Sequence, residues 1–137
     1  MGVILDSSVP IKSQRLRLTE SEMLKRVKSI VGGVELATSV IVITELLQGI
    51  FPASTPQIRQ RRKQFLEEFM LDMVVHPYVL STAEIAGKIG GEQIALGFTI
   101  PTIDLMIGAT ALSLNFSILT TNIRHFSLIP GLQVIPF

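Results

Sequence analysis

The sequence predicts a single α/β domain in which helices flank a mostly parallel central sheet. Short apolar runs alternate along the chain with longer segments of helical periodicity. The 137 residues are near the usual size of one globular domain, and 47% of them are hydrophobic, which argues against disorder. No internal repeat, low-complexity segment or long linker divides the chain. We therefore expect one domain over residues 1–137.

Five short runs are expected to form the strands of this sheet. The first, Val3–Leu5, is uniformly apolar and ends at Asp6, which is typical of a buried parallel strand with a polar residue at its tip. The other four expected strands are Glu35–Ser39, Met73–His76, Ser117–Thr120 and Gln133–Ile135.

Helices are expected between these strands, and local signals mark where several begin. Thr19 and Glu22 match the capping box T-x-x-E, in which each side chain bonds the other residue's backbone N–H. Pro56 fits the first turn of a long helix that runs through residue 71. Ser81–Glu84 matches a second capping box, and Gly90-Gly91 weakens the helix that it opens. The other expected helices are Ile41–Ile50 and Thr102–Leu114.

Charge and cysteine content exclude several classes of protein. Twelve basic and 11 acidic residues give a net charge of +1, which excludes a general polycation and gives no reason to expect attraction to a membrane surface. Without cysteine, disulfides and thiolate zinc sites are impossible, and a cytoplasmic location is expected. No membrane span is expected, because Leu36–Thr44 is too short and Leu105–Ile123 is polar in its second half. A secretory signal is not expected either, since Asp6 directly follows the short apolar start.

Three acidic residues stand in hydrophobic surroundings. Asp6 ends the first strand, Glu45 interrupts an apolar helix, and Asp104 lies in the first turn of the last long helix. Ligands of such a sheet bind beyond the carboxyl ends of its strands. Buried carboxylates are costly unless paired, protonated or bound to metal, and no lysine or arginine adjoins these three. If they converge, Mg²⁺ or Mn²⁺ would relieve their repulsion, and Asn122 could add a neutral oxygen ligand or orient water.

Most of these residues also have a structural interpretation. Asp6 could cap the turn that follows it, Asp104 could complement the helix dipole, and Asn122 could be an ordinary turn residue. Glu45 is the hardest to explain in this way, because an acid among isoleucine, valine and leucine has no evident partner in the sequence.

Four motifs stand in order along the chain at Ile4–Val9, Thr44–Gly49, Ile103–Leu112 and Leu119–Phe126, and a terminal segment follows at Ile129–Val134. They resemble the signatures of PIN domains, and most closely those of the VapC-type ribonuclease toxins of toxin–antitoxin pairs. Four ordered motifs at the right intervals are far more specific than any one of them, and the resemblance covers nearly the whole chain.

The resemblance implies an acidic pocket that holds one or two Mg²⁺ or Mn²⁺ ions and hydrolyses RNA phosphodiester bonds. The family's first three acids fall on Asp6, Glu45 and Asp104, with Asp6 and Asp104 holding the metal and Glu45 binding it or positioning water. The fourth polar position falls on Asn122, where many relatives carry aspartate, which weakens the case for a second ion. The resemblance also implies a cognate antitoxin as partner and a homodimer.

Other readings stay open beside this one. A catalytically weak PIN-like binding module is the alternative, and Asn122 favours it. The basic run Arg59–Lys63 could contact RNA phosphates or form a solvated helix face. His125 could act as a general base or be a capping or surface residue. A phosphotransfer protein is disfavoured, because Asp6-Ser7-Ser8 lacks the second aspartate of a D-x-D motif and no lysine follows Lys88.

Overall fold

The computed structural model describes all residues, Met1–Phe137, and contains one sheet of five parallel strands in the order β3-β2-β1-β4-β5. The expected α/β class is confirmed, and the sheet is parallel throughout. Each strand lies within one or two residues of its predicted position. The strands are β1 (Gly2–Leu5), β2 (Glu35–Ser39), β3 (Val74–His76), β4 (Ser117–Thr120) and β5 (Val134–Pro136).

Seven helices connect or follow these strands. Five of them match the predicted helices, whereas the short α1 and α7 were not expected. The α1 segment combines two serines, a proline and three other polar residues, so it carries no long apolar stripe. The helices are α1 (Ser8–Arg15), α2 (Glu20–Val31), α3 (Val40–Gln48), α4 (Pro56–Asp72), α5 (Leu80–Ala95), α6 (Thr102–Ser113) and α7 (Ile123–Phe126).

One predicted capping box is confirmed and the other is wrong. At the start of α2, Thr19 Oγ1 accepts from the N–H of Glu22 at 3.2 Å, and Glu22 Oε1 accepts from the N–H of Thr19 at 3.0 Å. At α5 the first cap residue is Val79, and no side chain caps the helix. The N–H of Ala83 bonds the carbonyl of Val79 at 2.9 Å, so Ser81 already lies inside the first turn and cannot cap it.

The helix α5 also runs unbroken through its two central glycines. A Cβ atom on Gly90 would lie 2.7 Å from Leu105 Cδ2 of α6. Glycine at this position therefore allows α5 to pack closely against α6, and this tertiary contact outweighs its low helix propensity.

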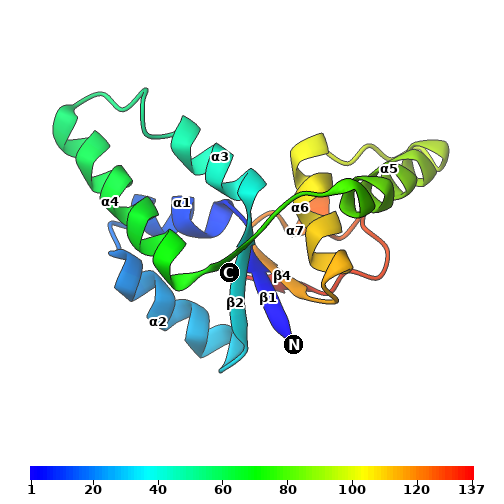
Figure 1. Cartoon of the computed structure of the whole chain (residues 1–137), viewed down its shortest axis with the longest axis horizontal. Coiled ribbons are helices and arrows are strands. Elements are labelled where there is room, and N and C mark those ends of the chain that lie inside the picture. Colours follow the sequence, from blue (N-terminus) through cyan, green and yellow to red (C-terminus); the bar gives the residue numbers. More distant parts are fainter.

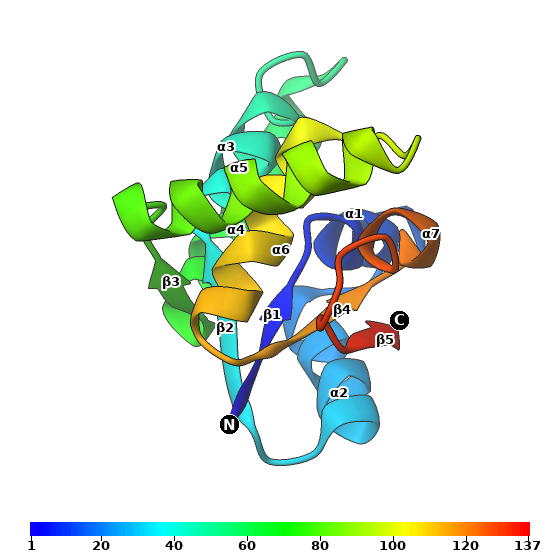
Figure 2. The same ribbon diagram turned by 90° about the vertical axis from the view of Figure 1, so that its right-hand side faces the viewer.

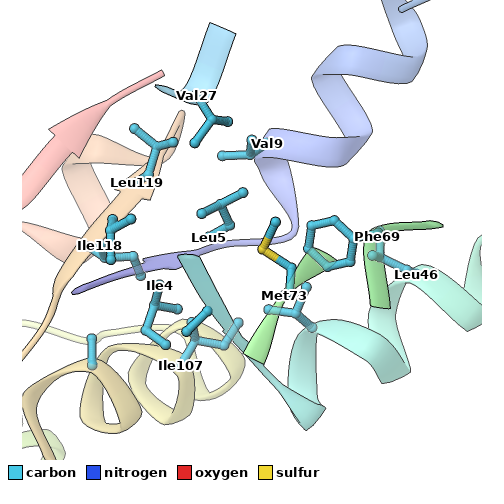
Figure 3. Packing of buried hydrophobic residues seen from close by; sticks show 14 of the residues in the cluster. Ile4, Leu5, Val9, Val27, Leu46, Phe69, Met73, Ile107, Ile118 and Leu119 are labelled. Carbon is cyan, nitrogen blue, oxygen red and sulfur yellow. The ribbon is translucent and has the colours of Figure 1, made fainter. Parts of the chain in front are cut away.

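The helices cover both faces of the sheet, as Figures 1 and 2 show. Helices α1, α2 and α4 lie on one side, α5 and α6 lie on the other, and α3 contacts both α4 and α6. In Figure 3, Leu5 points toward Val9 and Val27 on one face of β1, while Ile4 points toward Ile107 of α6 on the other. These side chains are fully buried, so one core extends through the sheet. None of the helices has both the length and the apolar character of a membrane span.

The parallel topology determines where polar side chains can gather. All five strands run in the same direction, so their carboxyl ends lie at one edge of the sheet. Asp6 follows the central strand β1, Thr120 ends the neighbouring strand β4, and α3 with Glu45 follows β2 directly. Three of the five strands thus bring polar residues to the same edge.

Candidate active site

Asp6 is the most buried of the three acids at this edge, with no exposed surface. Its backbone N–H bonds the carbonyl of Leu119 at 3.1 Å, so β1 and β4 remain paired up to this residue. Its Oδ2 atom accepts hydrogen bonds from Ser8 Oγ at 2.7 Å and from Thr120 Oγ1 at 2.9 Å. The other oxygen, Oδ1, is buried and has no hydrogen-bond partner. One oxygen of the carboxylate is therefore held in place, and the other is left as a free acceptor.

The turn after β4 orients the two hydroxyl groups that bind Asp6. Ser8 Oγ accepts from the backbone N–H of Thr121 at 2.9 Å, and Thr120 Oγ1 accepts from the backbone N–H of Asn122 at 2.9 Å. Each hydroxyl oxygen thus accepts from the turn and donates its own hydrogen to the carboxylate. This network fixes the orientation of the buried Asp6 carboxyl group.

Glu45 lies in the second turn of α3, half-buried, and its Oε1 atom has no hydrogen-bond partner. Burial raises the pKa of the Glu45 carboxyl, the charges of Asp6 and Asp104 raise it further, and a hydrogen bond from Ser7 opposes the rise. The carboxylate is therefore less stable in its charged form than an exposed glutamate, and an added positive charge would stabilise it.

Asp104 lies in the first turn of α6, and 13% of its side chain is exposed. Its Oδ2 atom lies 2.6 Å from Nδ1 of His125 in α7. Burial raises the pKa of the Asp104 carboxyl, the hydrogen bond to His125 opposes this, and the charge of Asp6 adds to the rise. The three predicted acids are therefore close enough to affect one another's ionisation.

The oxygen atoms at this site fit a hard divalent cation in kind but are not assembled as a complete ligand set. No three of the chain's aspartate, glutamate and histidine side chains are close enough to hold a metal ion together. However, Asp6 and Glu45 each leave a buried oxygen without a partner, which is costly for a carboxylate. The carboxylates also repel one another. A cation would satisfy both oxygens and reduce the repulsion.

The sequence matches the model of one known protein family over nearly its whole length. The PIN domain model matches residues 3–132. The chain belongs to the PIN domain family. This PIN domain is 30% identical over 135 residues to Ribonuclease VapC of Rickettsia bellii, in an alignment that covers 98% of this chain and 96% of the relative.

Solved structures agree with this assignment. VapBC2 from Rickettsia felis, bound to a DNA fragment from its promoter, matches 100% of this PIN domain and 99% of the matched chain with a TM-score of 0.85 at 20% identity. VapBC-1 from nontypeable Haemophilus influenzae matches 99% of this chain and 98% of its own with a TM-score of 0.81 at 25% identity. The PIN fold predicted from the sequence is thereby confirmed.

The remaining predicted site residue of this PIN domain, Asn122, is more exposed than the three acids. It is exposed, its side chain makes no capping bond, and only its backbone N–H takes part in the network around Asp6. Ser8 and Thr120, which lie in the segments Ile4–Val9 and Leu119–Phe126 that carry the family resemblance, both bind Asp6. Sequence reasoning favoured a capping or surface role for His125, whereas that ring contacts Asp104.

Proposed function

We propose that this PIN domain is a metal-dependent endoribonuclease that hydrolyses RNA phosphodiester bonds and acts as the toxin of a type II toxin–antitoxin pair. The observation that carries the proposal is the group of interacting carboxylates Asp6, Glu45 and Asp104, two of which leave buried oxygens without partners. The relatives named Ribonuclease VapC support the reaction class. A solved match described as a member of the VapBC family of toxin–antitoxin systems supports the biological role.

In this proposal Asp6 and Asp104 would hold Mg²⁺ or Mn²⁺, whose hard-acid character suits carboxylate oxygens, and Glu45 would bind the ion or position water. A cation bound there supplies Lewis-acid chemistry that activates water and neutralises the negative charge developing on the phosphate. Asp6 offers Oδ1 while Ser8 and Thr120 hold Oδ2, so the position of the free oxygen is fixed.

The other residues have complementary roles in this proposal. Glu45 Oε1 has no partner within the protein, so it is available to accept a hydrogen bond from water near the phosphate. His125 fixes the orientation of Asp104 through Oδ2 and is a positioning residue. The exposed Asn122 can donate its side-chain N–H groups to a phosphate oxygen. No protein nucleophile is required, since water attacks the phosphorus.

The proposal also includes two protein partners. A cognate antitoxin is supported by the structural matches, which are VapBC assemblies from several bacteria. A homodimer is proposed from the family resemblance alone. Sedimentation of the purified chain, with and without the protein encoded beside it, measures both associations directly.

The test compares RNA cleavage by the wild type and by Asp104→Asn in the presence of Mg²⁺ or Mn²⁺. We expect the variant to fold and to lose cleavage, because it loses one negatively charged metal ligand. Glu84→Gln, which neutralises an exposed acid on α5, is the matched control and should cleave as the wild type does. Unchanged cleavage by Asp104→Asn, or no cleavage by the wild type with either cation, would refute the proposed ribonuclease activity.

The second candidate is a catalytically weak PIN-like scaffold. The absence of a closed three-ligand group favours it, as does Asn122 in the fourth polar position. Thermal unfolding during titration with Mn²⁺ separates the two candidates. A nuclease site gains stability from the ion, and Glu45→Gln should abolish that gain. A scaffold shows neither effect.

A further inference from the structure

A groove with a volume of about 1010 Å³ opens beside Glu45, between α1, the start of α2, α3 and α4. Figure 1 shows α1, α2 and α4 on one side of the sheet, with α3 next to α4. Glu45 lines the groove, so the groove leads to the candidate active site. Its charged lining residues are Arg15, Arg17, Arg61, Arg62, Glu20, Glu45 and Glu68.

The arginines of the groove are not neutralised by ion pairs. The close contacts between basic and acidic side chains join Lys88 to Glu92 and His125 to Asp104, so they involve none of the four arginines. On the acidic side, burial and the neighbouring carboxylates raise the pKa of Glu20 to about 7. Four permanent positive charges therefore face fewer than three full negative charges near neutral pH.

Arg62 differs from the other three arginines, because its Nη1 donates a hydrogen bond to the carbonyl of Gly49 at 2.7 Å. This bond ties α4 to the end of α3 and gives Arg62 a place in the wall of the groove. The guanidinium groups of Arg15, Arg17 and Arg61 make no hydrogen bond or ion pair within the protein and remain available to a ligand.

Arg17 has a further distinctive property. It follows the C-terminus of α1 with φ +59°, in the left-handed region that favours glycine at helix ends. The chain therefore accepts an unfavourable backbone conformation while it places an arginine in the groove. Strained positions of this kind concentrate at functional sites.

We propose that Arg15, Arg17 and Arg61 bind the phosphate backbone of the RNA strand on one side of the cleaved bond and direct the strand toward Glu45. This inference rests on the proposed ribonuclease function. Charge complementarity supports it, since arginine guanidinium groups match phosphate oxygens and a groove of positive charge follows a polyanionic chain. The position supports it as well, because Glu45, one of the three candidate catalytic acids, lines the groove.

The groove also divides the basic run of α4 into two parts. Arg61 lies in the groove, whereas Arg59 lies on a smaller hollow with Lys63 and Phe51. Arg61→Ala and Arg59→Ala therefore remove the same charge from the same helix, inside and outside the groove. They form a matched pair of test and control variants.

The experiment measures binding of a short, fluorescently labelled single-stranded RNA to the full chain. All variants carry Asp104→Asn, which prevents cleavage during the measurement. We expect weaker RNA binding from each of the single variants Arg15→Ala, Arg17→Gly and Arg61→Ala. The slope of log affinity against log salt should become less steep by about 0.7 in each single variant and by about 2 in the triple variant. Arg59→Ala should leave both quantities unchanged. Arg17→Gly should unfold at the same temperature as its parent or higher, because glycine favours that backbone.

The outcomes separate this inference from the proposed function. Unchanged RNA affinity in the triple variant overturns the inference that the groove binds RNA, whether or not the wild type cleaves RNA. Lost affinity for the antitoxin with unchanged RNA affinity also overturns it and makes the groove a protein-docking site. If the triple variant loses RNA binding but the wild type cleaves no RNA, the groove stands and the ribonuclease proposal fails.

Discussion

Glu20 offers a quantitative test of how this fold places its charges. It is the first residue of α2, only 3% of its surface is exposed, and its Oε1 atom has no hydrogen-bond partner. Burial raises its pKa, and the nearby acids Asp72 and Glu68 of α4 raise it further, from 4.5 to about 7. Glu20→Gln keeps the size of the side chain and removes its ability to ionise.

The expected magnitude follows from that pKa. A change from 4.5 to about 7 corresponds to about 3 kcal/mol, at about 1.4 kcal/mol for each pH unit. Because the folded-state pKa is the higher one, the stabilisation is complete below pH 4.5 and is lost as the pH rises through about 7. Glutamine stays uncharged at every pH and avoids this loss. The variant should therefore gain about 3 kcal/mol at slightly alkaline pH.

Urea unfolding of both proteins across this pH range measures the effect. The two free energies of unfolding should nearly coincide at acidic pH and diverge as the pH rises through about 7. Glu67→Gln, an exposed acid on α4, is the control and should follow the wild type at every pH. An equal gain at all pH values, or no gain at alkaline pH, would show that Glu20 is not destabilised by ionisation.

Three further predictions concern the site, the core and a helix end. Thr120→Val removes a donor from buried Asp6, so we expect a loss of about 1.5–3 kcal/mol of stability in urea unfolding and at least tenfold slower RNA cleavage. Thr120→Ser keeps the hydroxyl and should restore most of the activity; cleavage at the wild-type rate by Thr120→Val would contradict the network. Gly108→Ala places a methyl group against Ile129 and should cost about 1–3 kcal/mol in thermal unfolding, whereas an unchanged Tm would show that the core repacks freely. Thr19→Ala removes the confirmed capping box of α2 and should cost about 1 kcal/mol by urea unfolding, with Thr19→Ser as the neutral control.

The sheet and the site acids could be predicted because their signals lie in short stretches of neighbouring residues. The apolar run before Asp6 requires burial, and its polar end marks the edge of a parallel sheet. Glu45 and Asp104 stand out because each interrupts or adjoins an apolar segment. The false capping box at Ser81 shows the limit of such signals, since the true start of α5 is fixed by the backbone at Val79.

The partners of these acids could not be predicted with the same certainty, because the chain brings them from far away in sequence. Thr120 is 114 residues from Asp6, and His125 is 21 residues from Asp104. Glu20 gives the clearest case. In the sequence it is an ordinary acid inside a capping box, and only the packing of α2 against α4 buries it beside Asp72.

The separation between Asp6 and Thr120 has a consequence for synthesis on the ribosome. The strand β1 can pair with β2 early, but its other neighbour, β4, is made more than a hundred residues later. Until β4 is in place, Asp6 lacks both its Thr120 donor and the backbone of Leu119. A nascent chain that has not yet reached β4 therefore has no assembled acidic site, and non-local contacts of this kind form late in folding. The site can assemble only after Thr120 has been translated, so its formation depends on a segment made long after Asp6.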